Sequence, residues 1–305
     1  MTLIPNTHRF THEAMGTIFD VDICCRDADY ARSASIEAYR LLDTLEQYLS
    51  RYIPNSDISR INNLKIGEWT RVSFETFECL MQCVELYELS KGAFDITIGA
   101  LYQIWLDEDK NLRSPSSVEI KRARDKVGMY HLAFDEEQFR VGKTGGPVRL
   151  DLGGFGKGYA LDKMAELLRE WDIESFWLNG GQSSMLFGTA PDGKEGWPIT
   201  ISDPFNEYKQ IREFVLSDRA ISGSGLIKGQ HIIDPRNGRP VPTTRAAWAF
   251  APTAAAADGL STTFMILSNA EIKDLCEQIP SKALILIKSD ESAESELLYM
   301  GSDYP

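Results

Sequence analysis

The apolar pattern predicts helices in the first half of the chain and mixed strands and helices in the second half. Strict alternation over 17–23 is typical of a half-buried strand. The stretch 50–63 breaks the apolar pattern with Pro54 and several Asn, Asp and Ser, which is typical of turns. Apolar residues at helical spacing predict helices over about 30–49, 74–91 and 117–127, with Phe74 and Phe77 facing inward from the second.

Beyond the third predicted helix, strand patterns become frequent. A hairpin is expected around 135–137, and a strand over 147–152 leads into a glycine-rich segment. Further short strands are expected at 176–178, 185–187, 198–202, 214–216, 247–251, 283–288 and 296–300, with helices at 159–171, 255–267 and 271–278. We find no internal repeat and no long linker, which favours one α+β unit over residues 1–305, with mixed short strands and packed helices. Two lobes within this unit are compatible with the pattern.

Charge and composition exclude several classes of partner. The 32 basic and 45 acidic residues give a net charge of −13, which argues against nucleic-acid binding and against docking on anionic lipid. No apolar run is long enough to insert into a membrane, and the N-terminus lacks a secretory pattern. The five cysteines contain no CxxC pair, which is typical of reduced thiols, and Cys79 and Cys83 are expected to be ordinary buried residues. These observations together predict a cytoplasmic protein.

The segment DLGGFGKGYALDK places four glycines, Gly153, Gly154, Gly156 and Gly158, between a predicted strand and a predicted helix. Backbone amides there can approach a ligand closely, and the following helix N-terminus favours anions. Neither the P-loop spacing nor the dinucleotide fingerprint is present. From the residues alone, a phosphate-binding loop and a tight turn without a ligand are equally supported.

Two later segments carry further candidate chemistry. HIIDPRNGRPV places His231 at the start of a turn-rich loop. PTAAAADGLSTTFMIL places Asp258 and Thr262 four residues apart, on one face of a predicted helix. Their oxygens suit Mg²⁺. The spacing alone favours a simpler alternative, in which Asp258 caps the helix N-terminus and Thr262 bonds a backbone carbonyl.

Taken together, these segments resemble the ApbE family of FAD:protein FMN transferases. The resemblance is collinear and covers roughly residues 10–290. Its segments, in chain order, are MGT at 15–17, SDISRIN at 56–62, GAFDITIGAL at 92–101, DLGGFGKGYALD at 151–162, WLNGGQSSMLFG at 177–188, AISGSG at 220–225, HIIDPRNGRPV at 231–241 and APTAAAADGLSTT at 251–263.

The resemblance implies an activity, a fold and a set of site residues. Family members bind FAD with Mg²⁺, move its FMN moiety onto a Thr or Ser hydroxyl of an acceptor protein, and release AMP. The implied fold is α+β with a T-fold-like core. The residues implied to line the FAD site are Met15, Tyr52, Ala93, Phe94, Asp95, Asp151, Lys157 and Ile233. Those implied to hold Mg²⁺ are Gly154, through its carbonyl, and the side chains of Asp258 and Thr262.

The residue types agree with these implied roles. Met15 and Tyr52 are suited to packing on a flat flavin ring, although both could be ordinary core residues. Lys157 places a positive charge where a pyrophosphate is expected. Asp258 and His231 are the candidates for the base that takes the acceptor's proton, and a structural role for His231 is equally supported.

The sequence departs from the family pattern in two places. Gln182 follows Gly180 and Gly181 where members often carry a carboxylate, and the loop between Gly223 and His231 is short. The leading prediction is transfer of FMN to a cytoplasmic acceptor flavoprotein. A Mg²⁺-dependent FAD pyrophosphatase and a non-catalytic FAD-binding protein are the alternatives, and intact Lys157, Asp258 and Thr262 argue against the latter.

Overall fold

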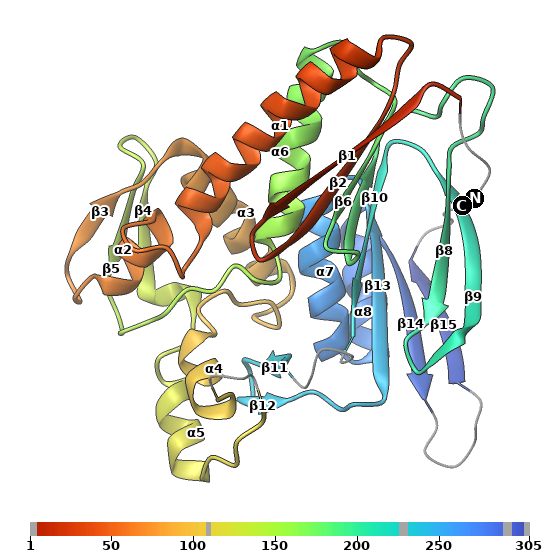
Figure 1. Cartoon of the computed structure of the whole chain (residues 1–305). Helices are drawn as coiled ribbons and strands as arrows, with labels where there is room; N and C mark the ends of the chain where they lie inside the picture. The colour runs from red at the N-terminus through yellow and green to blue at the C-terminus, as the bar shows by residue number, and fades with distance from the viewer. Residues whose placement is uncertain (1–4, 108–110, 226–230, 289–294, 302–305) are drawn as a thin grey trace.

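The central element of the fold is an eight-stranded sheet in which every neighbouring pair is antiparallel (Figure 1). The computed structural model describes residues 5–107, 111–225, 231–288 and 295–301. In order across the sheet, the strands are β1 (Thr7–Ala14), β2 (Thr17–Cys24), β6 (Phe176–Gly180), β7 (Ser184–Phe187), β10 (Arg219–Ser224), β13 (Arg245–Ala251), β14 (Lys282–Lys288) and β15 (Ser295–Gly301).

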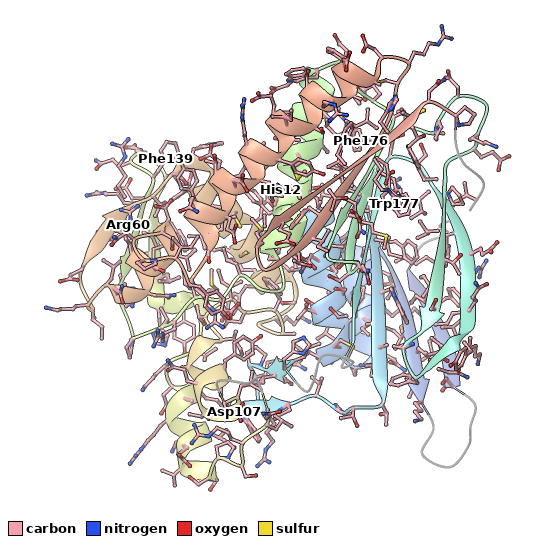
Figure 2. All side chains as sticks on the ribbon, in the orientation of Figure 1. His12, Arg60, Asp107, Phe139, Phe176 and Trp177 are labelled. Atoms are coloured by element: carbon pink, nitrogen blue, oxygen red, sulfur yellow. The ribbon has the colours of Figure 1, made fainter. Side chains whose placement is uncertain are left out.

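Helices cover one face of this sheet and a separate hairpin covers the other. The helices are α1 (Ala28–Leu49), α6 (Gly156–Glu170), α7 (Ala254–Ile266) and α8 (Asn269–Gln278), and the hairpin pairs β8 (Trp197–Asp203) with β9 (Asn206–Leu216) (Figure 1). Because successive side chains of a strand point to opposite faces, neighbours on β6 join different cores. Phe176 packs with the helices and Trp177 packs with the hairpin (Figure 2).

A smaller three-stranded sheet lies on the far side of the helices from the main sheet (Figure 1). Its strands are β3 (Trp69–Arg71), β5 (Arg140–Lys143) and β4 (Leu132–Asp135), accompanied by α2 (Asp57–Asn63) and α3 (Phe74–Leu89). Below it are α4 (Gly99–Trp105), α5 (Ser117–Arg124), and the short pair β11 (Ile233–Asp234) and β12 (Arg239–Pro240) (Figure 1). A 3₁₀ turn, Met129–His131, leads directly into β4.

Most predicted elements are confirmed, including the α+β class, but several predictions are wrong. The stretch 50–63, expected to be turns throughout, contains α2, because Ser56 caps it and both Ile58 and Ile61 are fully buried. Phe74, expected to face inward, begins α3 and is 54% exposed. The chain forms no strand over 147–152, where one bridge joins Arg149 to Ile98. The elements without a sequence prediction are β1, β3, β10, β11, β12 and α4.

The structure also tests the cysteine and membrane predictions. Cys79 and Cys83 are fully buried, as expected of ordinary core residues. In the described part of the chain, no group of three or more His, Cys, Asp or Glu could hold a metal ion. No helix among the described residues is sufficiently long and apolar to cross a membrane.

Candidate functional site

Asp258 lies in the second turn of α7 and is 4% exposed. The residue that caps this helix is Thr253, whose hydroxyl accepts a hydrogen bond from the Ala256 amide at 3.3 Å. The alternative in which Asp258 serves as the N-cap is therefore wrong. Its side chain instead points into the space between α7, α6 and the strands β7 and β10, as its hydrogen bonds show.

The Asp258 carboxylate is surrounded by donors from three elements. Its Oδ1 accepts hydrogen bonds from the hydroxyls of Ser184 at 2.9 Å and Ser222 at 3.0 Å. Its Oδ2 accepts one from the Gly158 amide at 3.1 Å, and the Lys157 Nζ lies 3.6 Å away. Ser184 and Ser222 are directly opposite each other in the paired strands β7 and β10. The sheet register therefore holds both hydroxyls on the same carboxylate oxygen.

Thr262 lies one turn further along α7, beside the glycine segment. A Cβ added to Gly154 would come within 3.0 Å of the Thr262 Oγ1, so a glycine allows this close approach. The Thr262 hydroxyl is 3.4 Å from that of Ser224, while it is Thr263 that donates to the backbone carbonyl of Gly259. The structure thus places Gly154, Lys157, Asp258 and Thr262, which the resemblance assigns to the site, close together.

The residues around Thr262 fit a hard cation such as Mg²⁺. Mg²⁺ commonly takes one or two carboxylates and completes its shell with water and substrate phosphates. The region between α7 and the glycine segment offers a buried carboxylate, a hydroxyl and an adjacent stretch of backbone, all of which can supply oxygen ligands. Asp258 and Thr262, with the Gly154 carbonyl, could therefore hold the ion, provided that a phosphate-bearing ligand supplies further oxygens.

A second group of predicted residues gathers at the start of the glycine segment. Asp151 forms an ion pair with Arg51, with the Nε to Oδ2 distance at 2.9 Å. The other Asp151 oxygen accepts a hydrogen bond from the Gly153 amide at 2.8 Å. The Arg51 guanidinium in turn lies 4.5 Å from the centre of the Tyr52 ring. Tyr52 and Asp151 are thus connected through Arg51, a residue that the sequence reasoning did not select.

The predicted residues at 93–95 lie next to the same segment. The Asp151 amide donates to the Ile96 carbonyl at 2.7 Å, and the Phe94 ring lies 5.7 Å from that of Phe155. Ala93 is fully buried. Burial raises the pKa of Asp95 to about 6, although hydrogen bonds from the Thr97 amide and hydroxyl oppose that shift.

The remaining predicted residues come from three other segments of the chain. Met15 and Gly16 form the turn between β1 and β2 with positive φ values of 51° and 69°, and Met15 packs against the core. Ile233 is buried in an apolar cluster that includes Ile98 and Leu101. His231 is half-buried. Most of the short loop that precedes it, at 226–230, lies outside the described residues.

Gln182, the departure from the family pattern, lies in the turn between β6 and β7. Its φ is +61°, and its amide donates to the Asn179 side chain at 3.1 Å. Any residue that replaces Gln182 must therefore tolerate a left-handed backbone conformation.

Sequence reasoning missed several residues that hold the site in place. Ser184 and Ser222 lie within two of the segments that carry the resemblance, but their shared partner, Asp258, can be identified only from the strand register. Asp162 on α6 accepts hydrogen bonds from the amides of Ala254 at 2.7 Å and Ala255 at 2.8 Å. These amides open α7, so an aspartate in the first turns of one helix fixes the start of the next. The sequence clue to this contact would have been a carboxylate on one predicted helix together with the start of the next predicted helix.

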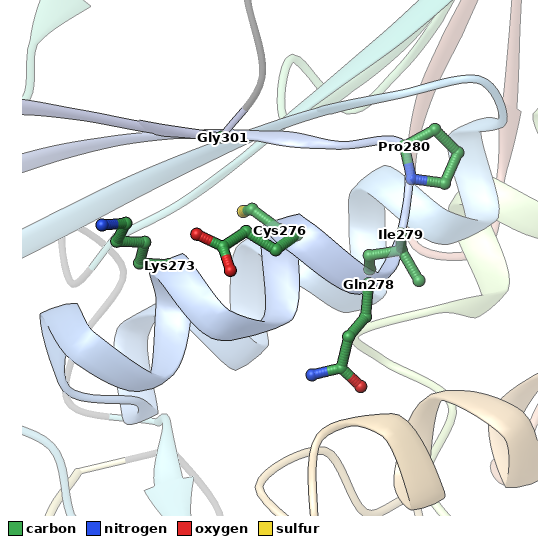
Figure 3. A pocket seen from close by; sticks show the side chains of 7 residues that line it. Lys273, Cys276, Gln278, Ile279, Pro280 and Gly301 are labelled. Atoms are coloured by element: carbon green, nitrogen blue, oxygen red, sulfur yellow. The ribbon is translucent and has the colours of Figure 1, made fainter.

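A separate hollow of about 500 Å³ lies between the end of α8 and the end of β15 (Figure 3). It is lined by Lys273, Cys276, Glu277, Gln278, Ile279, Pro280 and Gly301. None of these is a predicted site residue. The hollow does not contribute to the site around Asp258.

Comparisons with known proteins agree with this geometry. The model of the ApbE family matches residues 15–286, a range that contains every predicted site residue from Met15 to Thr262. The chain belongs to the ApbE family. ApbE relatives include the FAD:protein FMN transferases of Vibrio cholerae, 27% identical over 91% of this chain and 86% of that protein, and of Escherichia coli K12, 26% identical over 92% and 84%.

Solved ApbE structures show the same fold. The flavin transferase ApbE from Vibrio cholerae superposes with a TM-score of 0.85 at 23% identity, covering 97% of both chains. The flavinyl transferase ApbE of Pseudomonas stutzeri, in its apo form, gives a TM-score of 0.84 at 26% identity over 96% of this chain and 94% of that chain. The predicted α+β class and the resemblance to ApbE are therefore confirmed.

Proposed function

We propose that the protein is a Mg²⁺-dependent FAD:protein FMN transferase. The observation that carries the proposal is the setting of Asp258: a buried carboxylate held by Ser184 and Ser222, facing Lys157, one helical turn from Thr262. The carboxylate and hydroxyl oxygens are suited to bind a cation, and the lysine is suited to bind a pyrophosphate. The relatives named FAD:protein FMN transferase support the same assignment.

The proposed reaction moves a phosphoryl group between two oxygens. The hydroxyl oxygen of an acceptor Thr or Ser attacks the phosphorus on the FMN side of the FAD pyrophosphate. The bond from that phosphorus to the bridging oxygen breaks, AMP leaves with the bridging oxygen, and the hydroxyl proton passes to a base. Mg²⁺, when bound, supplies charge stabilisation of the pyrophosphate. Lys157 and the glycine-segment amides bind and orient the same phosphates.

Two residues were candidates for the base, and their surroundings favour different roles. Asp258 accepts three hydrogen bonds and faces Lys157, so its carboxylate is held in place as an anionic oxygen ligand. We assign it to the cation. His231 is half-buried and follows β10, whose Ser224 lies beside Thr262, and we assign proton removal to it.

The acceptor and the flavin contacts complete the proposal. We propose that Met15, Tyr52, Ala93, Phe94, Asp95, Asp151, Lys157 and Ile233 line the FAD site, and that the acceptor is a flavoprotein carrying a Thr or Ser segment. A flat ring needs apolar and aromatic surfaces, and Tyr52 offers one that is open to solvent.

The direct test incubates the chain with FAD and MgCl₂, with and without a purified reductase subunit that carries such a segment. Covalent flavin fluorescence on the denatured acceptor, with stoichiometric AMP, is the expected result. An acceptor in which that Thr or Ser is replaced by Val or Ala is the matched control and should remain unlabelled. AMP release without acceptor at the same rate would indicate a pyrophosphatase. FAD binding without AMP under any condition would contradict the proposal.

A further inference from the structure

Tyr52 is an exposed aromatic residue whose position is nonetheless fixed. Its side chain is 71% exposed in the loop between α1 and α2. The Arg51 guanidinium covers one face at 4.5 Å from the ring centre, and its Nη2 donates to the Tyr52 hydroxyl at 2.6 Å. The opposite face has no such cover, since most of the ring is open to solvent. One ring face is therefore held and the other is available.

Arg51 is itself held from two sides. Its Nε pairs with the Asp151 Oδ2 at 2.9 Å, and Asp151 is only 11% exposed. Its backbone carbonyl accepts a hydrogen bond from the Ser59 hydroxyl at 3.2 Å. The other Asp151 oxygen accepts a hydrogen bond from the Gly153 amide. Through Asp151, Arg51 therefore connects the Tyr52 loop to the glycine segment.

We infer that Arg51 is a positioning residue, which fixes the Tyr52 ring against the glycine segment so that its open face receives the flavin ring of FAD. This inference rests on the proposed function. The physical reason is preorganisation: a free surface tyrosine must lose rotational freedom when a ring stacks on it, whereas a clamped one has already lost it. The planar guanidinium can stack on the ring and pair with the carboxylate at once, which an ammonium cannot do.

The chain offers a closely matched control on the small sheet. Arg140 also combines an aromatic ring with a carboxylate: it lies 5.7 Å from the Trp69 ring and donates to the Asp135 Oδ2 at 2.5 Å. Trp69 is 43% exposed, so the geometry is similar, but Arg140 contacts Trp69 of β3 and Asp135 of β4 rather than the glycine segment. Arg140→Lys therefore controls for the loss of an exposed arginine clamp.

The experiment titrates wild type, Arg51→Lys and Arg140→Lys with FMN, FAD and ADP, following flavin fluorescence and, for ADP, heat. We expect Arg51→Lys to weaken FMN and FAD binding by roughly 3- to 10-fold and to reduce the quenching of bound flavin, because the ring is less often in place. ADP, which has no flavin, should bind as before, and Arg140→Lys should match wild type throughout.

A double-mutant cycle separates positioning from direct contact. In a Tyr52→Leu background, Arg51→Lys should cause no further loss of FMN affinity, because its effect acts through the ring. A further loss of the same size would show that Arg51 binds the ligand itself and would overturn the inference. Unchanged quenching and affinity in Arg51→Lys would also overturn it, as would loss of ADP binding alone. Absence of FAD binding by wild type would instead overturn the proposed function, and this inference with it.

Discussion

Burying a carboxylate such as Asp258 without partners would cost several kcal/mol of desolvation free energy. The structure offsets this cost with two serine hydroxyls, one backbone amide and a lysine. This arrangement also limits what the residue can do. These donors hold its oxygens in place as a fixed anionic ligand, which is why we assign Asp258 to the metal and proton removal to His231.

Removing one of the serine hydroxyls should weaken the site without disturbing the fold. Ser184→Ala or Ser222→Ala deletes a hydrogen bond to a charged oxygen, worth about 1.5–3 kcal/mol, so the Mg²⁺ concentration for half-maximal AMP release should rise roughly tenfold or more. Ser35→Ala is the control, because Ser35 is equally buried in α1 and its hydroxyl bonds the Arg32 carbonyl. An unchanged Mg²⁺ dependence in both site variants would contradict this role.

At the residue scale, spacing along the chain pairs side chains that share one element, whereas side chains that meet across elements were either implied only by the resemblance or missed. Asp258 and Thr262 could be paired because helical spacing alone places them on one face. Ser184 and Ser222 lie far apart in the chain and meet on Asp258 only through the register of β7 with β10. Arg51 likewise reaches Asp151 from a loop whose path the sequence does not specify.

At the scale of elements, α7 carries the predicted cation ligands and Asp162 of α6 holds its first turn. The two helices approach closely there, since a Cβ on Gly158 would come within 2.2 Å of the Ala254 carbonyl. The Asp162 carboxylate accepts hydrogen bonds from both the Ala254 and Ala255 amides. Burial raises the pKa of Asp162 to about 7. The position of Asp258 therefore depends on a carboxylate that titrates near neutrality.

This pKa predicts a pH dependence of folding stability. The folded pKa of Asp162 lies above its ordinary value of 3.8, so the folded state binds this proton more tightly than the unfolded state. The resulting stabilisation is complete below about pH 4 and is lost as the pH rises through about 7. The unfolding free energy of wild type minus that of Asp162→Asn should fall by roughly 1–3 kcal/mol over this range, discounted for partial exposure.

Denaturant unfolding of both proteins at several pH values between 4 and 8 measures that difference. Taking the difference cancels the titrations that the two proteins share. A difference that stays constant, or that rises with pH, would show that Asp162 has no raised pKa in the folded protein.

The wrong element predictions have identifiable causes. The region 147–152 has the composition of a strand, but the Asn62 side chain takes the place of a neighbouring strand. It accepts a hydrogen bond from the Leu150 amide at 2.6 Å and donates one to the Leu150 carbonyl at 3.1 Å. The stretch 50–63 has turn chemistry at its start, yet Ile58 and Ile61 supply the apolar face of α2. In both regions tertiary partners outweigh local composition.

At the scale of the whole molecule, the main sheet separates two apolar cores with different roles. The helical core supports α6 and α7, and hence the site. The other core lies under the β8–β9 hairpin and includes Trp197, Phe214, Phe250 and Leu284. Such a division predicts that the hairpin side contributes to stability and not to the chemistry.

Trp197→Ala tests this division. Trp197 is 1% exposed, and its indole nitrogen donates to the Thr189 carbonyl at 3.1 Å. Truncating it should lower the free energy of unfolding by about 3–5 kcal/mol. At a temperature where the variant remains folded, its Mg²⁺ dependence and FAD affinity should equal those of wild type. A selective change in Mg²⁺ dependence would show that the two cores are coupled.

The most direct test of the account is Mg²⁺-dependent AMP release from FAD, in the presence of acceptor, by the Asp258→Asn variant. If Asp258 is the anionic cation ligand, the rate should fall by about 10²–10³, while FAD binding and thermal stability change little. Asp203→Asn is the matched control: Asp203 is also buried and bonds a backbone amide, but it lies in the β8–β9 hairpin, and this variant should keep the wild-type rate. Full activity of Asp258→Asn with unchanged Mg²⁺ dependence would contradict the account.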